Sequence, residues 1–266
     1  MNASPIGIFD SGIGGLTVVR AVYERLPGES TVYFGDTARV PYGPKSPETV
    51  TRYSLEILDW LLKQEVKAVV IACNTSTAHA LETLQRQSPV PVIGVIEPGA
   101  RAAAAASRAG PVGVIGTAGT IASNAYARAI QRVRPGASVE QQACPLFVPL
   151  VEEGWFEHPA AELIAREYLD PLRKACVDTL VLGCTHYPLL RPLLQRVMGT
   201  EVRLIDSGEE TAAAVEQALT SAGLTAPPGG KPTHRFAVSD DEVRFRQVGA
   251  RFIGERMRKA EVVPLS

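Results

Sequence analysis

The sequence is poor in cysteine, lacks an excess of charge of either sign and contains no long apolar run. Four cysteines in 266 residues are too few for a disulfide framework, so we expect free thiols. The formal net charge of -1 gives no electrostatic footprint for nucleic acid. The longest strongly apolar runs, such as 68–72 and 180–182, are too short to cross a bilayer. We therefore expect neither a nucleic acid nor a membrane as a partner.

Signals for export and for metal binding are also missing. The first five residues lack the basic, apolar and small-residue succession of a secretion signal, so we expect a cytoplasmic protein. Cys184 lies close to His186, but no paired-cysteine spacing accompanies them, and we expect no metal site. Cys144 and Cys176 have apolar neighbours, and we interpret both as small buried residues.

What the sequence does contain is a regular alternation of strand-like and helix-like segments. Short apolar, β-rich runs are followed by turn residues and then by helical sequence, which is typical of βα units and a parallel sheet. The strand-like runs form two series: 6–9, 31–34, 68–72 and 92–96, then 112–115, 139–143, 179–182 and 202–205. The sequence therefore predicts an α/β fold.

Helix signals lie between and after these strands. The segment 46–64 begins with a capping serine and a proline and has apolar residues on one face, which predicts a helix on a sheet. Ser207 and Glu210 have the spacing of a capping box ahead of 212–222. Gly223 predicts the end of that helix.

The two series resemble each other, which indicates a duplicated domain. The run around Gly7 resembles the run around Gly113, 106 residues later, and the run through Cys73 resembles the run through Cys184, 111 residues later. Nearly equal offsets are expected for two homologous domains of similar size. We predict two pseudo-symmetric domains with parallel sheets and an active site in the cleft between them.

The predicted domain limits are 1–96 together with 208–266 for the first domain, and 97–207 for the second. The tail after residue 232 contains a strand candidate at 235–238 and a helical stretch at 240–252. Neither has a counterpart in the repeats. We expect this tail to return to the first domain, which makes that domain discontinuous in sequence.

Polar and thiol side chains gather where these strands end. In open parallel α/β sheets, ligands bind beyond the carboxyl ends of the strands. The residues at such positions are Asp10, Ser11, Asp36, Tyr42, Gly43, Cys73, Asn74, Thr75, Thr117, Cys184, Thr185 and His186. The glycine cluster Gly12, Gly14 and Gly15 matches neither the dinucleotide fingerprint nor a P-loop, so we do not expect a nucleotide.

Two cysteines at matching strand ends suit one reaction in particular. Inverting a stereocentre without a cofactor requires a base on one face of the α-carbon and an acid on the other. A thiol, with an ordinary pKa of about 8.5, can serve in either role once its neighbours tune it. Asp10 can raise the basicity of a thiol, and His186 can stabilise charge near Cys184. Cys73 and Cys184 are therefore the candidate acid/base pair.

The motifs that carry these residues resemble those of the glutamate racemase family, in the aspartate/glutamate racemase superfamily. They are DSGIGGLT at 10–17, ACNT at 72–75, GCTHYPL at 183–189, FGDT at 34–37, PYG at 41–43, GTAGT at 116–120 and LVEEG at 150–154. The resemblance implies two flavodoxin-like domains and interconversion of L- and D-glutamate without pyridoxal phosphate or metal. It also implies supply of D-glutamate to peptidoglycan synthesis.

The resemblance further implies roles for individual residues. Cys73 would act on the D-enantiomer and Cys184 on the L-enantiomer. The residues that would contact or orient the substrate are Asp10, Ser11, Tyr42, Gly43, Asn74, Thr75, Thr117, Thr185 and His186. Asp36 and Glu152 match positions implicated in the family. Loop hydroxyls, an amide and N–H groups at helix starts agree with a dicarboxylic amino acid, but the preference for glutamate over aspartate comes from the resemblance alone.

Other functions stay open at this stage. Aspartate racemase is the nearest alternative within the superfamily. A cysteine hydrolase could use one thiol as a nucleophile with His186 as its base, although the second cysteine would then be idle. A binding or regulatory module could retain the fold without turnover. Apolar helix faces permit a homodimer without specifying one.

Overall fold

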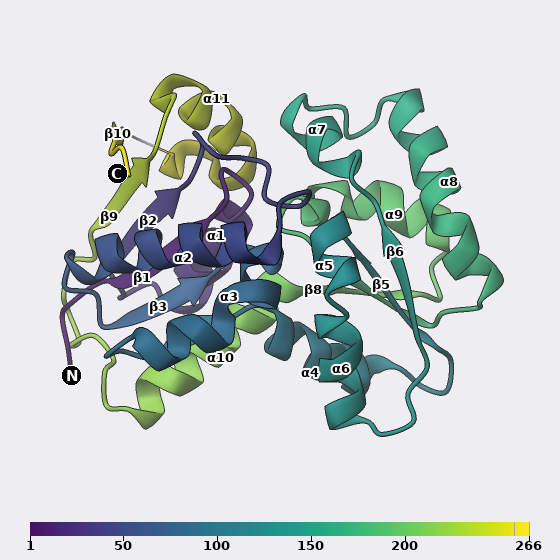
Figure 1. Ribbon diagram of the computed structural model, residues 1–266, viewed down its shortest axis with the longest axis horizontal. Helices are drawn as coiled ribbons and strands as arrows, with labels where there is room; N and C mark the ends of the chain where they lie inside the picture. Colours follow the sequence, from purple (N-terminus) through teal and green to yellow (C-terminus); the bar gives the residue numbers. More distant parts are fainter. Residues whose placement is uncertain (258, 266) are drawn as a thin grey trace.

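The computed structural model describes residues 1–257 and 259–265, and it confirms an α/β fold built on two parallel sheets (Figure 1). The first sheet has the order β10-β9-β2-β1-β3-β4, with β1 (Ile6–Asp10), β2 (Thr31–Gly35), β3 (Ala68–Ile71), β4 (Val92–Gly94), β9 (His234–Val238) and β10 (Ala260–Val262). The second has the order β6-β5-β7-β8, with β5 (Val112–Gly116), β6 (Val139–Ala143), β7 (Thr179–Gly183) and β8 (Arg203–Asp206).

Helices cover both sheets. Those on the side of the first sheet are α1 (Leu16–Arg25), α2 (Pro47–Leu62), α3 (Asn74–Gln87), α10 (Ser207–Ser221) and α11 (Glu242–Ile253). Those on the side of the second are α4 (Ile96–Ala106), α5 (Ala118–Ala122), α6 (Ala125–Val133), α7 (Phe147–Glu152), α8 (Pro159–Lys174) and α9 (Arg191–Met198). Two short 3₁₀ helices, η1 (Tyr187–Leu190) and η2 (Gly254–Arg256), complete the described elements.

The strand register shows how the two sheets correspond. Within the first sheet Gly7 of β1 pairs with Val69 of β3, and within the second Gly113 of β5 pairs with Leu180 of β7. Cys73 and Cys184 each stand four residues after the paired residue of their strand. The offsets of 106 and 111 residues are therefore compatible, because the second repeat has five more residues between its central strand and its cysteine strand.

The strands are buried on both faces, as the near-continuous apolar runs require in a parallel sheet. Ile6 and Ile8 of β1 pack on the side of α1 and α10, whereas Phe9 of the same strand packs with Ile57 and Leu61 of α2. The core on the α1 and α10 side continues without interruption into the core of the second sheet. The two halves therefore share one apolar interior along that side.

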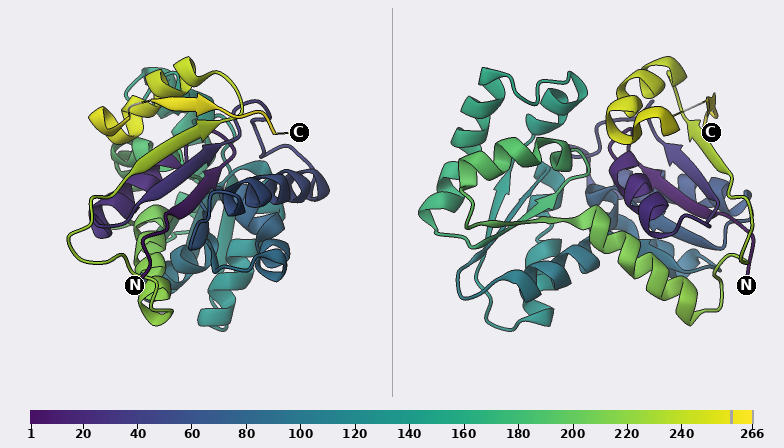
Figure 2. Two further views of the ribbon diagram at one scale, coloured as in Figure 1. Left: turned by 90° about the vertical axis from the view of Figure 1, so that its left-hand side faces the viewer. Right: turned by 180° about the vertical axis from the view of Figure 1, so that it is seen from behind.

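The chain crosses between the sheets twice. It leaves β4 through α4 to reach β5, and it leaves β8 through α10, which packs against α1 and α4. Figure 2 shows α10 running from the middle of the molecule along the first half. Strand β9 then pairs with β2, so the strand predicted at 235–238 lies in the first sheet. The domain limits drawn from the sequence stay a prediction.

Several local predictions differ from the structure. The strand expected over 92–96 ends at Gly94, and Ile96 already begins α4, because this short strand turns directly into the crossover helix. The cap of α10 is Asp206, whose side chain accepts the Gly208 N–H at 2.8 Å. The capping box predicted from Ser207 and Glu210 is therefore wrong, because Ser207 is already the first residue of the helix.

The helix start predicted at 46–64 is confirmed, whereas the prediction of two buried cysteines is confirmed for only one of them. Helix α2 is capped as predicted, with Ser46 Oγ accepting the Thr49 N–H at 3.3 Å. Cys144 is buried, as expected. Cys176 is exposed, which contradicts the sequence interpretation, because it lies in the turn after α8 with a left-handed φ of 55°.

Among the described residues, no helix is both long and apolar enough to cross a bilayer.

Candidate active site

Both candidate thiols lie just beyond the carboxyl end of a strand. That strand is β3, which lies between β1 and β4, in the first sheet and β7, which lies between β5 and β8, in the second. Cys73 follows β3 and caps α3, with its sulfur accepting the Ser76 N–H at 3.4 Å. Cys184 follows β7. The two side chains are buried, with 5% and 6% exposed. Equivalent positions in the two repeats therefore place one thiol on each side of the junction between the halves.

The surroundings of Cys73 favour the protonated thiol. Burial raises the pKa of Cys73 to about 11, and the nearby Asp10 carboxylate contributes to that rise. Asp10 lies at the end of β1, is itself buried, and accepts the Gly12 N–H at 3.0 Å. Burial also raises the pKa of Asp10, although the charge of His186 and the N–H groups of its own loop oppose this. Cys73 is thus set to donate a proton near neutral pH.

The surroundings of Cys184 are of the opposite kind. His186 Nδ1 lies 3.9 Å from the Cys184 sulfur, and His186 Nε2 lies 3.1 Å from Glu152 Oε1. Burial alone would lower the pKa of His186, but hydrogen bonds to Cys184 and Glu152 outweigh it and raise the pKa to about 10. A protonated imidazole therefore faces the sulfur, where it stabilises negative charge.

Asp10 connects the two thiol environments, because its charge acts on both Cys73 and His186. The halves approach closely at this point. A Cβ built on Gly14 would lie 2.2 Å from Thr185 Oγ1 and 2.5 Å from the His186 ring. Thr17 of α1 also donates its hydroxyl to the Thr185 carbonyl at 3.0 Å. The glycine cluster after β1 therefore allows the second half to pack against the first.

A second set of contacts crosses between the halves on the α3 side. The hydroxyl groups of Thr75 and Thr117 lie 2.9 Å apart, and Thr120 Oγ1 lies within 3.3 Å of Thr75 Oγ1. Gly119 N donates to Gly43 O at 2.9 Å. These bonds hold the loop around residues 41–43 and the starts of α3 and α5 together.

Tyr126 of α6 was not identified from the sequence. Its hydroxyl donates to Asn74 Oδ1 at 2.7 Å, and the ring is buried. The only sequence signal is that it stands ten residues after β5 ends, on a helix face that includes Ala129 and Ile130. That pattern predicts a core aromatic residue rather than a partner for a site residue.

Asp36 has a structural place beside the site. Its Oδ1 accepts the Ser239 hydroxyl at 2.8 Å, and its Oδ2 accepts the Arg39 Nε–H at 2.7 Å and the Tyr42 hydroxyl. Tyr42 in turn packs against Cys73. Both carboxylate oxygens of Asp36 are therefore occupied in holding the loop that carries Tyr42.

Two buried side-chain atoms near Cys73 have no hydrogen-bond partner within the described residues: Asp10 Oδ1 and Asn74 Nδ2. Buried polar groups are otherwise nearly always paired. The hydroxyls of Ser76 and Ser11 are within hydrogen-bonding reach of the Cys73 sulfur. The arrangement therefore offers both donors and acceptors to a polar ligand beside the first thiol.

The residues predicted from the sequence occur in this one region, with Asp10, Ser11, Tyr42, Asn74 and Thr75 on the Cys73 side and Thr185 and His186 on the Cys184 side. Gly43 and Thr117 meet between them. Within residues 1–257 and 259–265, no group of three or more His, Cys, Asp or Glu side chains is arranged to hold a metal ion.

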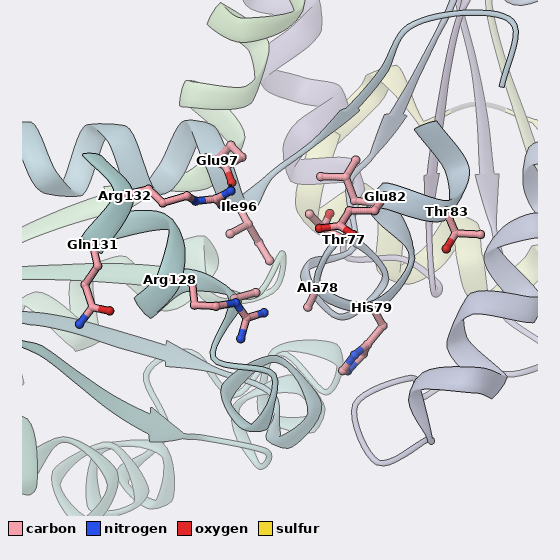
Figure 3. A pocket seen from close by; sticks show the side chains of 12 residues that line it. Thr77, Ala78, His79, Glu82, Thr83, Ile96, Glu97, Arg128, Gln131 and Arg132 are labelled. Carbon is pink, nitrogen blue, oxygen red and sulfur yellow. Dashed lines mark hydrogen bonds and ion pairs between the residues drawn. The ribbon is translucent and has the colours of Figure 1, made fainter. Parts of the chain in front are cut away.

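A separate hollow of about 640 Å³ lies among α3, α4 and α6 and contains none of the predicted site residues. Figure 3 shows His79 on one side of it and the Arg132–Glu97 ion pair on the other, with Arg128 between them. Opposite charges line it together, so its lining does not select one ligand charge.

Comparisons with known proteins agree with the fold. A family model described as Asp/Glu/Hydantoin racemase matches residues 14–218. A glutamate racemase from Geobacter metallireducens is 58% identical over 252 residues, which are 95% of this chain and 93% of that protein.

Two solved structures resemble the whole chain. The glutamate racemase of Francisella tularensis in complex with D-glutamate has a TM-score of 0.93 at 39% identity, covering 100% of this chain and 99% of that one. The glutamate racemase of Thermus thermophilus in complex with beta-chloro-D-alanine has a TM-score of 0.90 at 45% identity, covering 99% and 98%.

Proposed function

Because the chain belongs to the Asp/Glu/Hydantoin racemase family, we propose that it interconverts L-glutamate and D-glutamate with Cys73 and Cys184 as its acid/base pair. The observation that carries this proposal is the pair of buried thiols at equivalent strand ends. One has a carboxylate beside it, and the other has an imidazole held by a carboxylate. Two groups alike in kind and opposed in position are what a two-base racemisation requires.

In the L-to-D direction, the Cys184 thiolate removes the α-proton of L-glutamate. The electron pair of the broken C–H bond passes into the α-carboxylate, and the Cys73 thiol donates its proton to the opposite face of the α-carbon. Cys184 ends as a thiol and Cys73 as a thiolate, so no net proton is gained or lost. The D-to-L direction is the reverse.

The neighbours of each thiol serve this proton transfer. The charged His186 faces the Cys184 sulfur at 3.9 Å and stabilises the thiolate that begins the step. Burial beside Asp10 keeps Cys73 protonated until its proton is needed. After transfer, the repulsion between Asp10 and the Cys73 thiolate makes that thiolate a strong base for the return reaction.

The polar groups around the thiols support binding of a dicarboxylic amino acid. Asn74 Nδ2 is a buried donor without a partner in the described part of the chain, and it lies at the start of the 14-residue helix α3. Such a helix start favours a carboxylate. Asp10 Oδ1 is an unpaired acceptor suited to an ammonium group. The choice of glutamate rests on the relatives, which are glutamate racemases.

We also propose that the D-glutamate formed serves peptidoglycan synthesis in the cytoplasm, as the resemblance of the motifs implies. This part of the proposal concerns the fate of the product and not the chemistry of the site.

The test is to incubate the purified protein with L-glutamate in deuterium oxide without added cofactor. We expect optical rotation to decay to zero, with deuterium entering the D-enantiomer while the remaining L-glutamate stays unlabelled early in the reaction. L-aspartate in a parallel reaction tests the alternative substrate. Racemisation of aspartate alone would replace the substrate in this proposal, and a trapped acyl-enzyme without α-deuterium exchange would replace the reaction.

A further inference from the structure

The C-terminal helix α11 reaches across to the second half of the molecule beside Cys184. Helix α11 packs on α1 in the first half, and Figure 1 shows it across from α7 of the second half. Arg244 and Arg251 stand seven residues apart on α11, which places them on one side of the helix. Both side chains point to the end of α7 at Glu152.

The two arginines contact different parts of Glu152. Arg244 Nη2 lies 3.6 Å from Glu152 Oε2. Arg251 Nη1 donates to the backbone carbonyl of Glu152, and its guanidinium packs on Gly154. The Phe252 ring next to it meets the His186 ring edge to face at 5.7 Å. Helix α11 therefore contacts both members of the pair that serves Cys184.

Glu152 transmits the contact of Arg244 to the thiol. Its Oε1 bonds to His186 while its Oε2 faces Arg244, so the carboxylate is held from both sides. Only 19% of the Glu152 side chain is exposed, against 53% for Arg244. Removing Arg244 would leave the half-buried Glu152 carboxylate with His186 as its one fixed partner. The carboxylate that holds the His186 imidazole would then be less firmly oriented.

We propose that Arg244 is a positioning residue for the reaction at Cys184, acting through Glu152 on His186 when α11 lies against α7. The proposal rests on the proposed two-cysteine function. Arg251 has a different part, because its hydrogen bond goes to the backbone carbonyl of Glu152 and fastens α11 to the backbone of α7.

The charged groups that face this pair come from four elements. His186 faces Cys184 beyond β7, Glu152 on α7 and Asp10 on β1. Glu152 faces Arg244 on α11, and the neighbouring Glu153 also lies 3.7 Å from Arg244. The hydrogen bond of His186 and the charge of Arg244 lower the pKa of Glu152 against the effect of its burial.

The main test is Arg244→Gln, with Arg246→Gln as the matched control. Arg246 carries the same charge on the same helix but lies 3.4 Å from Glu242 of that helix. We expect Arg244→Gln to lower kcat about two- to fivefold, the range for a half-exposed ion pair, with KM little changed. Arg244→Lys should recover part of the loss, and Arg246→Gln should match the wild type.

The pH dependence separates positioning from general damage. Without Arg244, Glu152 takes up a proton at a higher pH, so the acidic limb of the kcat/KM profile should move to higher pH. In Arg246→Gln it should stay in place. Circular dichroism melting of each variant checks that the fold is retained.

A double-mutant cycle makes the test decisive. In a Glu152→Gln background, Arg244→Gln should have little further effect, whereas Arg251→Met should still lower activity because its contact is with the backbone. Equal losses from Arg244→Gln in both backgrounds, or identical behaviour of Arg244→Gln and Arg246→Gln, would overturn the proposal. Racemisation by the wild type is measured first, so a failed inference is distinct from a failed function.

Discussion

Tyr126 of α6 donates its hydroxyl to the amide oxygen of Asn74 at 2.7 Å, so a side chain of the second half fixes a site residue of the first. Both residues are buried. With its oxygen engaged, Asn74 presents its amide NH₂ as the free end, and that nitrogen has no partner among the described residues. The bond therefore determines which end of the amide a substrate would meet.

Removing this hydroxyl should weaken substrate binding. In Tyr126→Phe the buried amide oxygen loses its donor, which costs about 1–3 kcal/mol, and Asn74 is free to rotate. We expect the KM for glutamate to rise about tenfold. Tyr168→Phe is the control, because its hydroxyl accepts a 3.4 Å bond from Leu146 N away from the site. Steady-state kinetics with an unchanged KM in Tyr126→Phe would contradict this role.

Close approach at Gly14 predicts a second effect. A methyl group there would lie 2.2 Å from Thr185 Oγ1 and 2.5 Å from the His186 ring, both beside Cys184. Such overlap forces the second half or the imidazole to shift. We expect Gly14→Ala to lower kcat/KM at least about tenfold, since small displacements of catalytic groups are costly.

Gly28→Ala is the control for this glycine, because a Cβ at Gly28 meets none of the described residues within 4 Å. Its kinetics should equal those of the wild type. Full activity in Gly14→Ala would mean that the halves are not packed together at this point during catalysis.

The two cysteines should be separable by one-sided chemistry. Cys73→Ser and Cys184→Ser should each lower racemisation by about 10²- to 10⁴-fold, the usual contribution of an acid or base. Each variant should still remove the α-proton of one enantiomer of a β-chlorinated glutamate, releasing chloride. Cys73→Ser should act on the L-form and Cys184→Ser on the D-form.

Cys176→Ser provides the control, because this thiol is exposed in the turn after α8. It should racemise glutamate like the wild type. A wild-type rate in either single variant at Cys73 or Cys184 is incompatible with the two-base scheme, and chloride release from the same enantiomer by both would contradict their opposed placement.

The sequence could predict the strands, their parallel pairing and the position of each thiol at the end of a strand. These features follow from local periodicity and from the rule that ligands bind at strand ends. Cys73 and Cys184 each occupy the same register position in their sheets. The repeat could be detected because each strand and the loop that follows it form one continuous stretch of sequence, which can be compared between the two series.

Other contacts could not be predicted, because they depend on how the two halves dock. Tyr126 reads as an ordinary core residue, and the partner that gives it a role is 52 positions earlier in the chain. Arg251 and Glu152 are 99 positions apart. No local pattern encodes such pairs. The exposed Cys176 was misjudged because apolar neighbours in sequence did not reveal the left-handed turn that carries it outward.

His186 gives a prediction about stability and pH. Hydrogen bonds to Cys184 and Glu152 outweigh burial and raise its pKa to about 10 in the fold, against about 6.5 for an unperturbed histidine. Between these values the His186 imidazole holds a proton in the folded protein that it has lost in the unfolded chain. The stabilisation is therefore complete below about pH 6.5 and is lost as the pH rises through about 10.

The measurement is the free energy of unfolding by urea at intervals from pH 7 to pH 9 in a Cys184→Ser background, with His186 and with His186→Gln, so that a proton released by the Cys184 thiol cannot offset the one held by His186. The protein with His186 should lose stability as the pH rises, by at most about 1.4 kcal/mol per pH unit from this group, and the variant should show a flatter profile. Two neighbours do not obscure the comparison. Cys73, with its pKa raised to about 11, departs from an unfolded thiol only towards the alkaline end. Glu152, whose pKa is lowered, contributes a change only in acid. Parallel profiles for the two proteins would show that His186 is not held protonated, and the role given to it beside Cys184 would have to be revised.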